Sequence, residues 1–332
     1  MLKFGTDGVR GVANADLTPE LALALGRAAA RVLGGDRFAI GRDTRRSGPM
    51  LEAALCAGLV SEGADVELLG VAPTPEVAWW SVTAGAPAAV VSASHNPFAD
   101  NGIKLFAAGG RKLADDVEER LEDELQRLLG DAAPGRPPDA PTGAGVGAVR
   151  TVSASAHAGY RAAVSGTLGG RDLAGLRAVV DCAHGSASVV APGVLSELGV
   201  EVEVIHAEPD GTNINAGCGS THPEELARRV AARGADVGVA FDGDADRVLL
   251  VDAAGELVDG DHIIAICAID RHERGALAGD SVVVTVMTNL GFRLAMDKRG
   301  IHVVETQVGD RYVLEELESR RLDLGGEQSG HV

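Results

Sequence analysis

The chain repeats one pattern of hydrophobic and polar positions three times. In each copy a continuous apolar run is followed by a polar loop, an amphipathic helical stretch, a glycine and a second apolar run. This order is typical of a parallel β-α-β unit. The three copies span residues 38–70, 178–206 and 281–306.

Glycines mark the ends of the predicted helices. Gly63, Gly199 and Gly300 each stand between a helical stretch and the next apolar run, where a helix C-cap is expected. The apolar runs are continuous rather than alternating, which favours sheets covered on both faces. Three units over 332 residues therefore predict three similar α/β domains in tandem, with parallel or mixed sheets.

Two breaks in the pattern predict the domain boundaries. A Pro/Gly-rich stretch at residues 131–147 reads as a connection, and a softer boundary is expected near residues 251–260. We predict domains over 1–150, 151–252 and 253–332. Because the chain stops at Val332 in mid-pattern, we expect the third domain to be incomplete and the sequence to be a fragment.

Composition and charge restrict the partners. The chain is 45% hydrophobic and 23% charged, as globular proteins are, and its net charge of −18 argues against nucleic acid or anionic membrane. The polar N-terminus is no signal peptide, and no apolar run approaches the roughly 18 residues of a membrane span, so we expect a cytoplasmic protein. The cysteines form no C-x-x-C pair, so neither a disulfide framework nor a structural zinc site is expected; they are Cys56, Cys182, Cys218 and Cys267.

Three aspartates follow the apolar run VGVA in FDGDADR, residues 241–247. They are placed at the C-terminal end of a strand, where parallel sheets bind ligands. In extended backbone Asp242, Asp244 and Asp246 would point to one side. Close carboxylates repel one another without a cation between them, and oxygen ligands suit Mg²⁺ or Mn²⁺.

Other interpretations of this motif compete with metal binding. An EF-hand loop counted from Asp242 would need glycine and glutamate where Arg247 and Ala253 stand. A haloacid-dehalogenase motif, D-x-D-x-[TV], fails because Asp246 occupies its fifth place. A solvated acidic turn stays open, so the motif alone does not decide.

The stretch VVSASHNPFADNGIKLF, residues 90–106, breaks an apolar run at Ser94. A turn serine is the ordinary explanation, and the absence of G-x-S-x-G disfavours acyl transfer. Phosphoryl transfer fits better, because a phosphorylated Ser94 would complete a Mg²⁺ shell begun by the aspartates. His95, Lys104 and Arg247 would then supply donors to the remaining charge.

A glycine-flanked loop, GGEQSGH at residues 325–331, ends the sequence. Glu327, Ser329 and His331 alternate along it. Such groups can hydrogen-bond the vicinal hydroxyls or the amino group of a sugar, but a surface turn explains them equally well.

Five motifs occur in the order typical of one enzyme superfamily. FGTDGVRG, ASHNP, NGIK, DGDADR and GEQSGH resemble the landmarks of the α-D-phosphohexomutases and span nearly the whole sequence. FGTDGVRG, NINAGCGSTHPEEL, VGDRYVLEEL and GEQSGHV are most similar to the bacterial phosphoglucosamine mutase family. Each motif is weak alone, but five in order are specific.

The resemblance implies an isomerase acting as an intramolecular phosphotransferase, on the route to UDP-N-acetylglucosamine and peptidoglycan precursors. It would interconvert glucosamine 6-phosphate and glucosamine 1-phosphate through a phosphoserine at Ser94 and a 1,6-bisphosphate intermediate. One Mg²⁺ would polarise the transferred group, with a hexosamine or hexose 1,6-bisphosphate as activator. The implied metal ligands are Ser94, Asp242, Asp244 and Asp246.

The resemblance also places residues around a central cleft between the domains. The expected catalytic residues are Ser94, Arg10, His95, Lys104, Arg247 and His331. Lys104 and His331 are both candidates for the general base. The expected substrate-binding residues are Thr306, Asp310, Arg311, Glu327 and Ser329.

Departures from the family pattern leave alternatives open. We expect the family's fourth domain, with its R-x-S-G-T-E-P-type phosphate loop, to be absent, since Ser165-Gly166-Thr167 is followed by Leu168 rather than glutamate. A phosphomannomutase or phosphoglucomutase, and a non-catalytic sugar-phosphate-binding fragment, are the alternative functions. The expected partner is a phosphosugar, without nucleic acid or membrane, and a homodimer is consistent with relatives that pair through their first domain.

Overall fold

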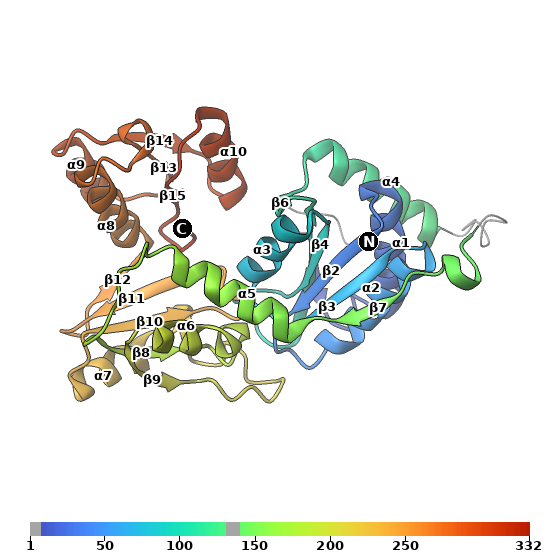
Figure 1. The fold of residues 1–332 in the computed structure, drawn as a ribbon, viewed down its shortest axis with the longest axis horizontal. Coiled ribbons are helices and arrows are strands. Elements are labelled where there is room, and N and C mark those ends of the chain that lie inside the picture. Colours follow the sequence, from blue (N-terminus) through green and yellow to red (C-terminus); the bar gives the residue numbers. More distant parts are fainter. Residues whose placement is uncertain (1–7, 131–139) are drawn as a thin grey trace.

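The structure, a computed structural model, describes residues 8–130 and 140–332. The start of FGTDGVRG and most of the predicted connection at 131–147 therefore lie outside the described residues. Within the described ranges three separate sheets follow one another along the chain, each with its own helices (Figure 1). This confirms the prediction of three α/β domains in tandem.

The first domain is built on a mixed sheet with strand order β1-β5-β4-β2-β3-β7, and β6 pairs with β5. Its strands are β1 (Val9–Val12), β2 (Arg37–Arg42), β3 (Asp65–Val71), β4 (Ala88–Val91), β5 (Asp100–Ala107), β6 (Arg111–Lys112) and β7 (Val149–Thr151). Its helices are α1 (Pro19–Leu33), α2 (Gly48–Ser61), α3 (Thr74–Ala84) and α4 (Asp115–Leu129), with η1 (Gly143–Gly145) before β7. The antiparallel pairs β1–β5 and β4–β5 make the sheet mixed.

Both faces of this sheet are buried, as the continuous apolar runs predict. Ile40 and Val91 belong to the core beneath α1, α2 and α4. Their neighbours Ala39 and Val90 belong to a second core beneath α3 and α5 (Ser153–Gly166). Successive side chains of a strand point to opposite faces, so a doubly covered strand needs apolar residues at every position.

The second domain has the sheet order β12-β11-β10-β8-β9. β8 is parallel to both β9 and β10, whereas β10, β11 and β12 are antiparallel neighbours. The strands are β8 (Arg177–Asp181), β9 (Glu201–Ile205), β10 (Val237–Phe241), β11 (Val248–Asp252) and β12 (Leu257–Val258). The helices are η2 (Ser186–Val189), α6 (Ala191–Glu197), η3 (Gly219–Thr221) and α7 (Glu224–Arg233).

The third domain is a parallel sheet of order β14-β13-β15. Its strands are β13 (Ser281–Thr285), β14 (His302–Thr306) and β15 (Gly325–Gly326). Its helices are α8 (Gly260–Glu273), η4 (Ala278–Asp280), α9 (Leu290–Asp297) and α10 (Asp310–Arg320). None of the helices in the described residues is long and apolar enough to cross a membrane.

Local sequence signals fix the ends of several helices. Thr18, Asp259 and Asn289 precede α1, α8 and α9, and each side chain accepts a hydrogen bond from the backbone N–H three residues later. The predicted C-cap glycines have left-handed backbone: φ is 97° at Gly63 and 85° at Gly199. Glycine adopts this conformation without steric cost, so the chain turns there into the next strand.

The exact domain limits stay predictions. The predicted boundary at residue 150 falls inside β7, which pairs with β3 of the first sheet. The predicted boundary at residue 252 precedes β12, which pairs with β11 of the second sheet. Helix α5 contacts α3 and β3 of the first domain and α6 of the second, so it runs between the two domains (Figure 1).

Candidate functional site

The loop after β4 presents Ser94. β4 ends at Val91, and the chain turns at Ser94 with φ of 51°, a left-handed conformation uncommon outside glycine. The Ser94 N–H donates to Ser92 Oγ at 2.9 Å, which supports the turn locally. Ser94 is only 1% exposed, so the turn holds its hydroxyl inside the protein.

The loop after β10 gathers the three aspartates. β10 ends at Phe241, and the chain then turns, with φ of 56° at Ala245. One carboxylate oxygen from each of Asp242, Asp244 and Asp246 lies within 4.8 Å of the others. The predicted convergence is therefore confirmed, but its stated reason was wrong: a tight turn brings the carboxylates together, not an extended strand.

The serine and aspartate loops meet directly. Ser94 Oγ donates to Asp242 Oδ2 at 2.5 Å and lies 3.5 Å from Asp246 Oδ1. Gly243 makes this approach possible, because a Cβ there would stand 2.7 Å from the Ser94 carbonyl oxygen. Contacts that short require the backbone to shift, so only glycine fits between the loops.

Lys104 of β5 supplies a buried positive charge. Its Nζ lies 3.0 Å from Asp244 Oδ2 and 2.8 Å from Asp246 Oδ2. Burial opposes ionisation of Asp244, but Lys104 and the Thr74 hydroxyl hold the pKa of Asp244 below its usual value. Burial and repulsion from the two neighbouring carboxylates raise the pKa of Asp242 well above its usual value.

The aspartate loop fits a hard divalent cation. Its donors are all oxygens, the type that Mg²⁺ and Mn²⁺ prefer. Asp244 Oδ1 is buried and has no hydrogen-bond partner in the part of the chain that the structure describes. Three close carboxylates beside one ammonium leave negative charge that a divalent cation would offset.

Three further predicted residues lie near the serine and aspartate loops. His95 Nδ1 lies 3.4 Å from Ser94 Oγ, and burial together with Arg247 and Arg10 lowers the pKa of His95. Arg10 stands on β1 opposite Gly102 of β5. Arg247 donates its backbone N–H to Asp242 Oδ1 at 3.2 Å, and its Nε to His331 Nε2 at 3.1 Å.

A cavity of about 590 Å³ opens between the second and third domains. Arg247 lines it from the aspartate loop, and Glu327, Ser329 and His331 line it from the predicted sugar loop. Glu327 Oε1 accepts a hydrogen bond from the Gly309 N–H at 2.8 Å, which fixes the carboxylate. This volume is in the usual range for small-molecule sites.

The structure separates three of the predicted substrate-binding residues, Thr306, Asp310 and Arg311. Asp310 lines the cavity and also pairs with Lys112 Nζ at 2.6 Å. Arg311 instead pairs with Asp115 at 2.6 Å and Glu118 at 3.4 Å, both on α4 of the first domain. Thr306 ends β14 and is not among the residues that line the cavity.

Arg45 was missed by the sequence analysis, although its contacts hold the serine loop. Its guanidinium is fully buried, and Nη2 donates to the carbonyl oxygens of Ser94 at 2.8 Å and Asn96 at 2.9 Å. Nη1 donates to Pro97 and Asp100 carbonyls, and Nε to Asp43 Oδ2. Its place just after the apolar run of β2 marks a strand-end loop, but its contact with the serine loop depends on the parallel pairing of β2 with β4.

Two residues that join the first and second domains were also missed. Asn215 Nδ2 donates to the Ser94 carbonyl at 2.9 Å. Thr74 donates its hydroxyl to Asp244 Oδ2 at 2.8 Å and its N–H to the Asp244 carbonyl at 2.8 Å. Asn215 lies within the motif NINAGCGSTHPEEL, but its contact, like those of Thr74, depends on how the domains dock.

Three family models match this chain in order along its length. They are described as phosphoglucomutase/phosphomannomutase, alpha/beta/alpha domain I, over residues 1–129; domain II, over 164–255; and domain III, over 259–332. The fold and the site therefore define a phosphosugar mutase, an isomerase that acts as an intramolecular phosphotransferase.

Curated relatives identify which family of phosphosugar mutases this chain belongs to. The phosphoglucosamine mutase of Desulforudis audaxviator is 55% identical over 99% of this chain and 72% of its own length. That of Pelotomaculum thermopropionicum is 57% identical over 99% of this chain and 73% of its own length. The chain belongs to the phosphoglucosamine mutase family. It spans about three quarters of the length of these relatives.

Solved structures agree on the fold. A phosphoglucomutase/phosphomannomutase family protein from Burkholderia thailandensis is 27% identical, with a TM-score of 0.82 over 98% of this chain and 70% of its own. The Aspergillus fumigatus N-acetylphosphoglucosamine mutase in complex with GlcNAc-6P and magnesium is 18% identical, with a TM-score of 0.64 over 100% of this chain and 67% of its own. Because the Aspergillus fumigatus enzyme is only 18% identical, its similarity to this chain shows the fold alone.

Proposed function

We propose that the chain interconverts glucosamine 6-phosphate and glucosamine 1-phosphate with Ser94 as the phosphate carrier and a 1,6-bisphosphate as intermediate. One observation carries the proposal: the buried Ser94 hydroxyl faces Asp242 and Asp246 from another domain, beside Lys104. A hydroxyl among carboxylates and an ammonium suits phosphoryl transfer, where charge must be offset on both the attacking and leaving oxygens.

A single Mg²⁺ held by Asp242, Asp244, Asp246 and the Ser94 oxygen is part of the proposal. The oxygen-only donor set supports it, as does Asp244 Oδ1, which has no hydrogen-bond partner among the described residues. When bound, the ion would polarise the transferred phosphoryl group. Lys104 contacts the two carboxylates farther from Ser94 and would help retain their charge.

The transfer itself needs one proton acceptor and one proton donor. A sugar hydroxyl oxygen forms a bond to phosphorus while the bond from phosphorus to Ser94 Oγ breaks. The hydroxyl proton passes to a base, and a proton reaches Oγ. Lys104 and His331 are the candidates for the base: Lys104 lies against Asp246, and His331 Nδ1 is 4.0 Å from Asp246 Oδ1.

The cavity between the second and third domains would hold the sugar. Asp259 and Glu327 line it together with the guanidinium of Arg247 and with Asp310, whose carboxylate already pairs with Lys112. An ammonium on the sugar is favoured next to carboxylates, which supports glucosamine phosphate over glucose or mannose phosphate. Ser329 would donate to or accept from a sugar hydroxyl.

The test is phosphorylation of Ser94. After incubation with a hexose 1,6-bisphosphate, intact-mass measurement should show one phosphoryl group per chain, located at Ser94 by peptide mapping. Ser94→Ala should carry none and should lose mutase turnover to background, whereas Ser155→Ala, an exposed serine hydroxyl on α5, should behave as wild type. Substantial turnover by Ser94→Ala would contradict the carrier role, and a clear preference for mannose phosphate would contradict the substrate.

We also infer that the enzyme works in the cytoplasm on a free phosphosugar, without nucleic acid or membrane. The net charge of −18 supports this, because like charges repel anionic polymers and lipid surfaces. A homodimer through the first domain is proposed on the family resemblance, and sedimentation at several concentrations would test it.

A further inference from the structure

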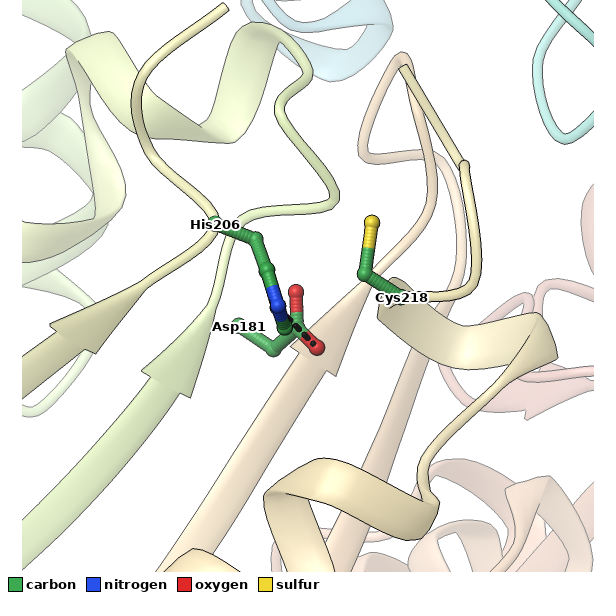
Figure 2. A group of neighbouring side chains, drawn as sticks. All are labelled: Asp181, His206 and Cys218. Atoms are coloured by element: carbon green, nitrogen blue, oxygen red, sulfur yellow. Dashed lines mark ion pairs between the residues drawn. The ribbon is translucent and has the colours of Figure 1, made fainter. Parts of the chain in front are cut away.

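A second group of metal-binding side chains lies in the second domain, outside the aspartate loop. Asp181 ends β8, His206 follows β9, and Cys218 precedes η3. Figure 2 shows the three side chains as neighbours that come from separate segments, with His206 and Asp181 paired. One donor atom from each, a carboxylate oxygen, a ring nitrogen and a thiol sulfur, lies within 4.8 Å of the others.

The carboxylate of Asp181 is held in place before any ion binds. It is fully buried; Oδ1 accepts the Ala183 N–H and Oδ2 the Gly219 N–H, each at 2.9 Å. Within the described ranges no lysine or arginine pairs with it, and its recorded ion pair is with His206 at 3.0 Å. A buried carboxylate without a permanent cation is costly, so a bound cation would stabilise this arrangement.

The ring of His206 is oriented as a metal ligand is. Its Nδ1 is buried beside Asp181 yet makes no hydrogen bond of acceptable geometry among the described residues. Its Nε2 lies 3.4 Å from Glu225 Oε2 on α7. A histidine bound to a metal typically donates its other ring N–H to a carboxylate, and Glu225 occupies that place.

We propose that Asp181, His206 and Cys218 bind one Zn²⁺, with water as the fourth ligand. Zinc accepts oxygen, nitrogen and sulfur donors in a four-coordinate shell, whereas Mg²⁺ and Ca²⁺ take oxygen donors. The site therefore selects a different ion from the aspartate loop. This assignment does not rest on the phosphoserine mechanism.

The ion would link the three segments that carry Asp181, His206 and Cys218. Residues beside these ligands hydrogen-bond to the first domain, including its serine loop. Asn215, which lies between His206 and Cys218, donates its N–H to the Ala183 carbonyl at 2.9 Å and its side chain to the Ser94 carbonyl. The His184 carbonyl accepts the Thr44 hydroxyl of the first domain at 2.6 Å. Zinc at the base of these segments would have a structural role, with its effect felt at the domain interface.

Cobalt substitution provides the test, on the full chain in excess Mg²⁺ so that the aspartate loop is occupied by its own ion. Co²⁺ bound to a thiolate gives a charge-transfer band in the near ultraviolet. We expect this band at one Co²⁺ per chain, its displacement by one equivalent of Zn²⁺, and a higher Tm with Zn²⁺ than after chelation. Absence of a thiolate band in the wild-type protein overturns the proposal without any variant.

Variants then assign the ligands. Cys218→Ser should abolish the band, and His206→Asn should do so as well; asparagine tolerates the φ of 51° at this position. Cys182→Ser is the matched control, a buried thiol on the loop after β8 that is outside the cluster, and it should keep the band. Glu225→Gln should weaken Zn²⁺ binding about 10- to 100-fold. A band that survives Cys218→Ser would show another thiol to be the ligand and overturn the assignment.

Discussion

At the scale of single residues, Arg45 decides where Ser94 stands. Its planar guanidinium donates to backbone carbonyls on both sides of the turn and to Asp43, while Ser92 donates to the same carboxylate at 2.7 Å. A turn with left-handed backbone at a serine persists only when its surroundings hold it. Arg45 is thus a positioning residue, which touches the loop and not the reacting atoms.

Replacement of Arg45 tests this role. In Arg45→Lys the charge remains but the fork of donors is lost, so the loop carbonyls lose partners. We expect kcat to fall about 100-fold, as misplacement by about an ångström can cause, with little change in KM for the phosphosugar. Steady-state kinetics on the folded fraction, established by circular dichroism, would measure it.

The neighbouring Arg42 offers the matched control. It pairs with Glu52 Oε2 at 3.1 Å and makes no recorded contact with the serine loop within the described residues. Arg42→Lys should leave kcat near the wild-type value. Equal losses in both variants would mean that Arg45 acts through general stability rather than through Ser94.

At the scale of elements, helices α1 and α2 pack backbone to backbone through two glycines. A Cβ at Gly58 would stand 2.2 Å from the Leu23 carbonyl oxygen, and one at Gly26 would stand 2.2 Å from that of Leu55. Only glycine permits this approach, which presses both helices onto the first sheet. The helix crossing therefore depends on residues that have low helix propensity.

Gly58→Ala tests whether the close packing of the two helices outweighs helix propensity at this position. Helix propensity favours alanine, but overpacking between the helices should dominate and lower the free energy of unfolding by about 1–3 kcal/mol. Denaturant titration would measure the change.

Gly166→Ala is the control within a helix. Nothing lies within 4 Å of a Cβ at the end of α5, so this variant should be neutral or more stable by up to about 1 kcal/mol. A destabilisation of similar size in both variants would contradict the close-packing explanation for Gly58.

At the scale of the whole molecule, the first domain meets its two neighbours by different interactions. Its contacts with the second domain are mostly buried and include hydrogen bonds of Thr74 and Asn215, the ion pairs of Lys104 with the aspartate loop and the close approach at Gly243. Its contacts with the third domain include the ion pairs Lys112–Asp310 and Arg311–Glu118. Charged contacts at a surface are screened by salt, so the third domain should be the more easily displaced.

Small-angle X-ray scattering at rising ionic strength tests this difference. Between 0.1 and 1 M salt the Debye length falls from about 10 to about 3 Å, and we expect the radius of gyration to increase. Arg311→Met should show the larger radius already at low salt. Arg320→Met, which removes an ion pair with Glu316 inside α10, should follow the wild-type curve; a salt-independent radius in the wild type would contradict the prediction.

Periodicity and motif order determined much of this protein before any coordinates. The parallel β-α-β units, the C-cap glycines and the family all follow from short-range patterns, because strand burial and helix ends depend on neighbouring residues. Ser94 and the three aspartates were found because each follows an apolar run, at the strand ends where parallel sheets bind ligands.

The tertiary structure alone decided which distant residues meet. Arg45 and Asn215 reach the serine loop from positions 49 and 121 residues away, and no local pattern records such contacts. Spacing likewise argued against a zinc site, because it tests only ligands close in sequence, whereas Asp181 and His206 stand at the ends of the adjacent strands β8 and β9 and Cys218 joins them from the segment before η3. Sequence fixes local conformation through nearest neighbours; the docking of loops and domains depends on the packing of the whole chain.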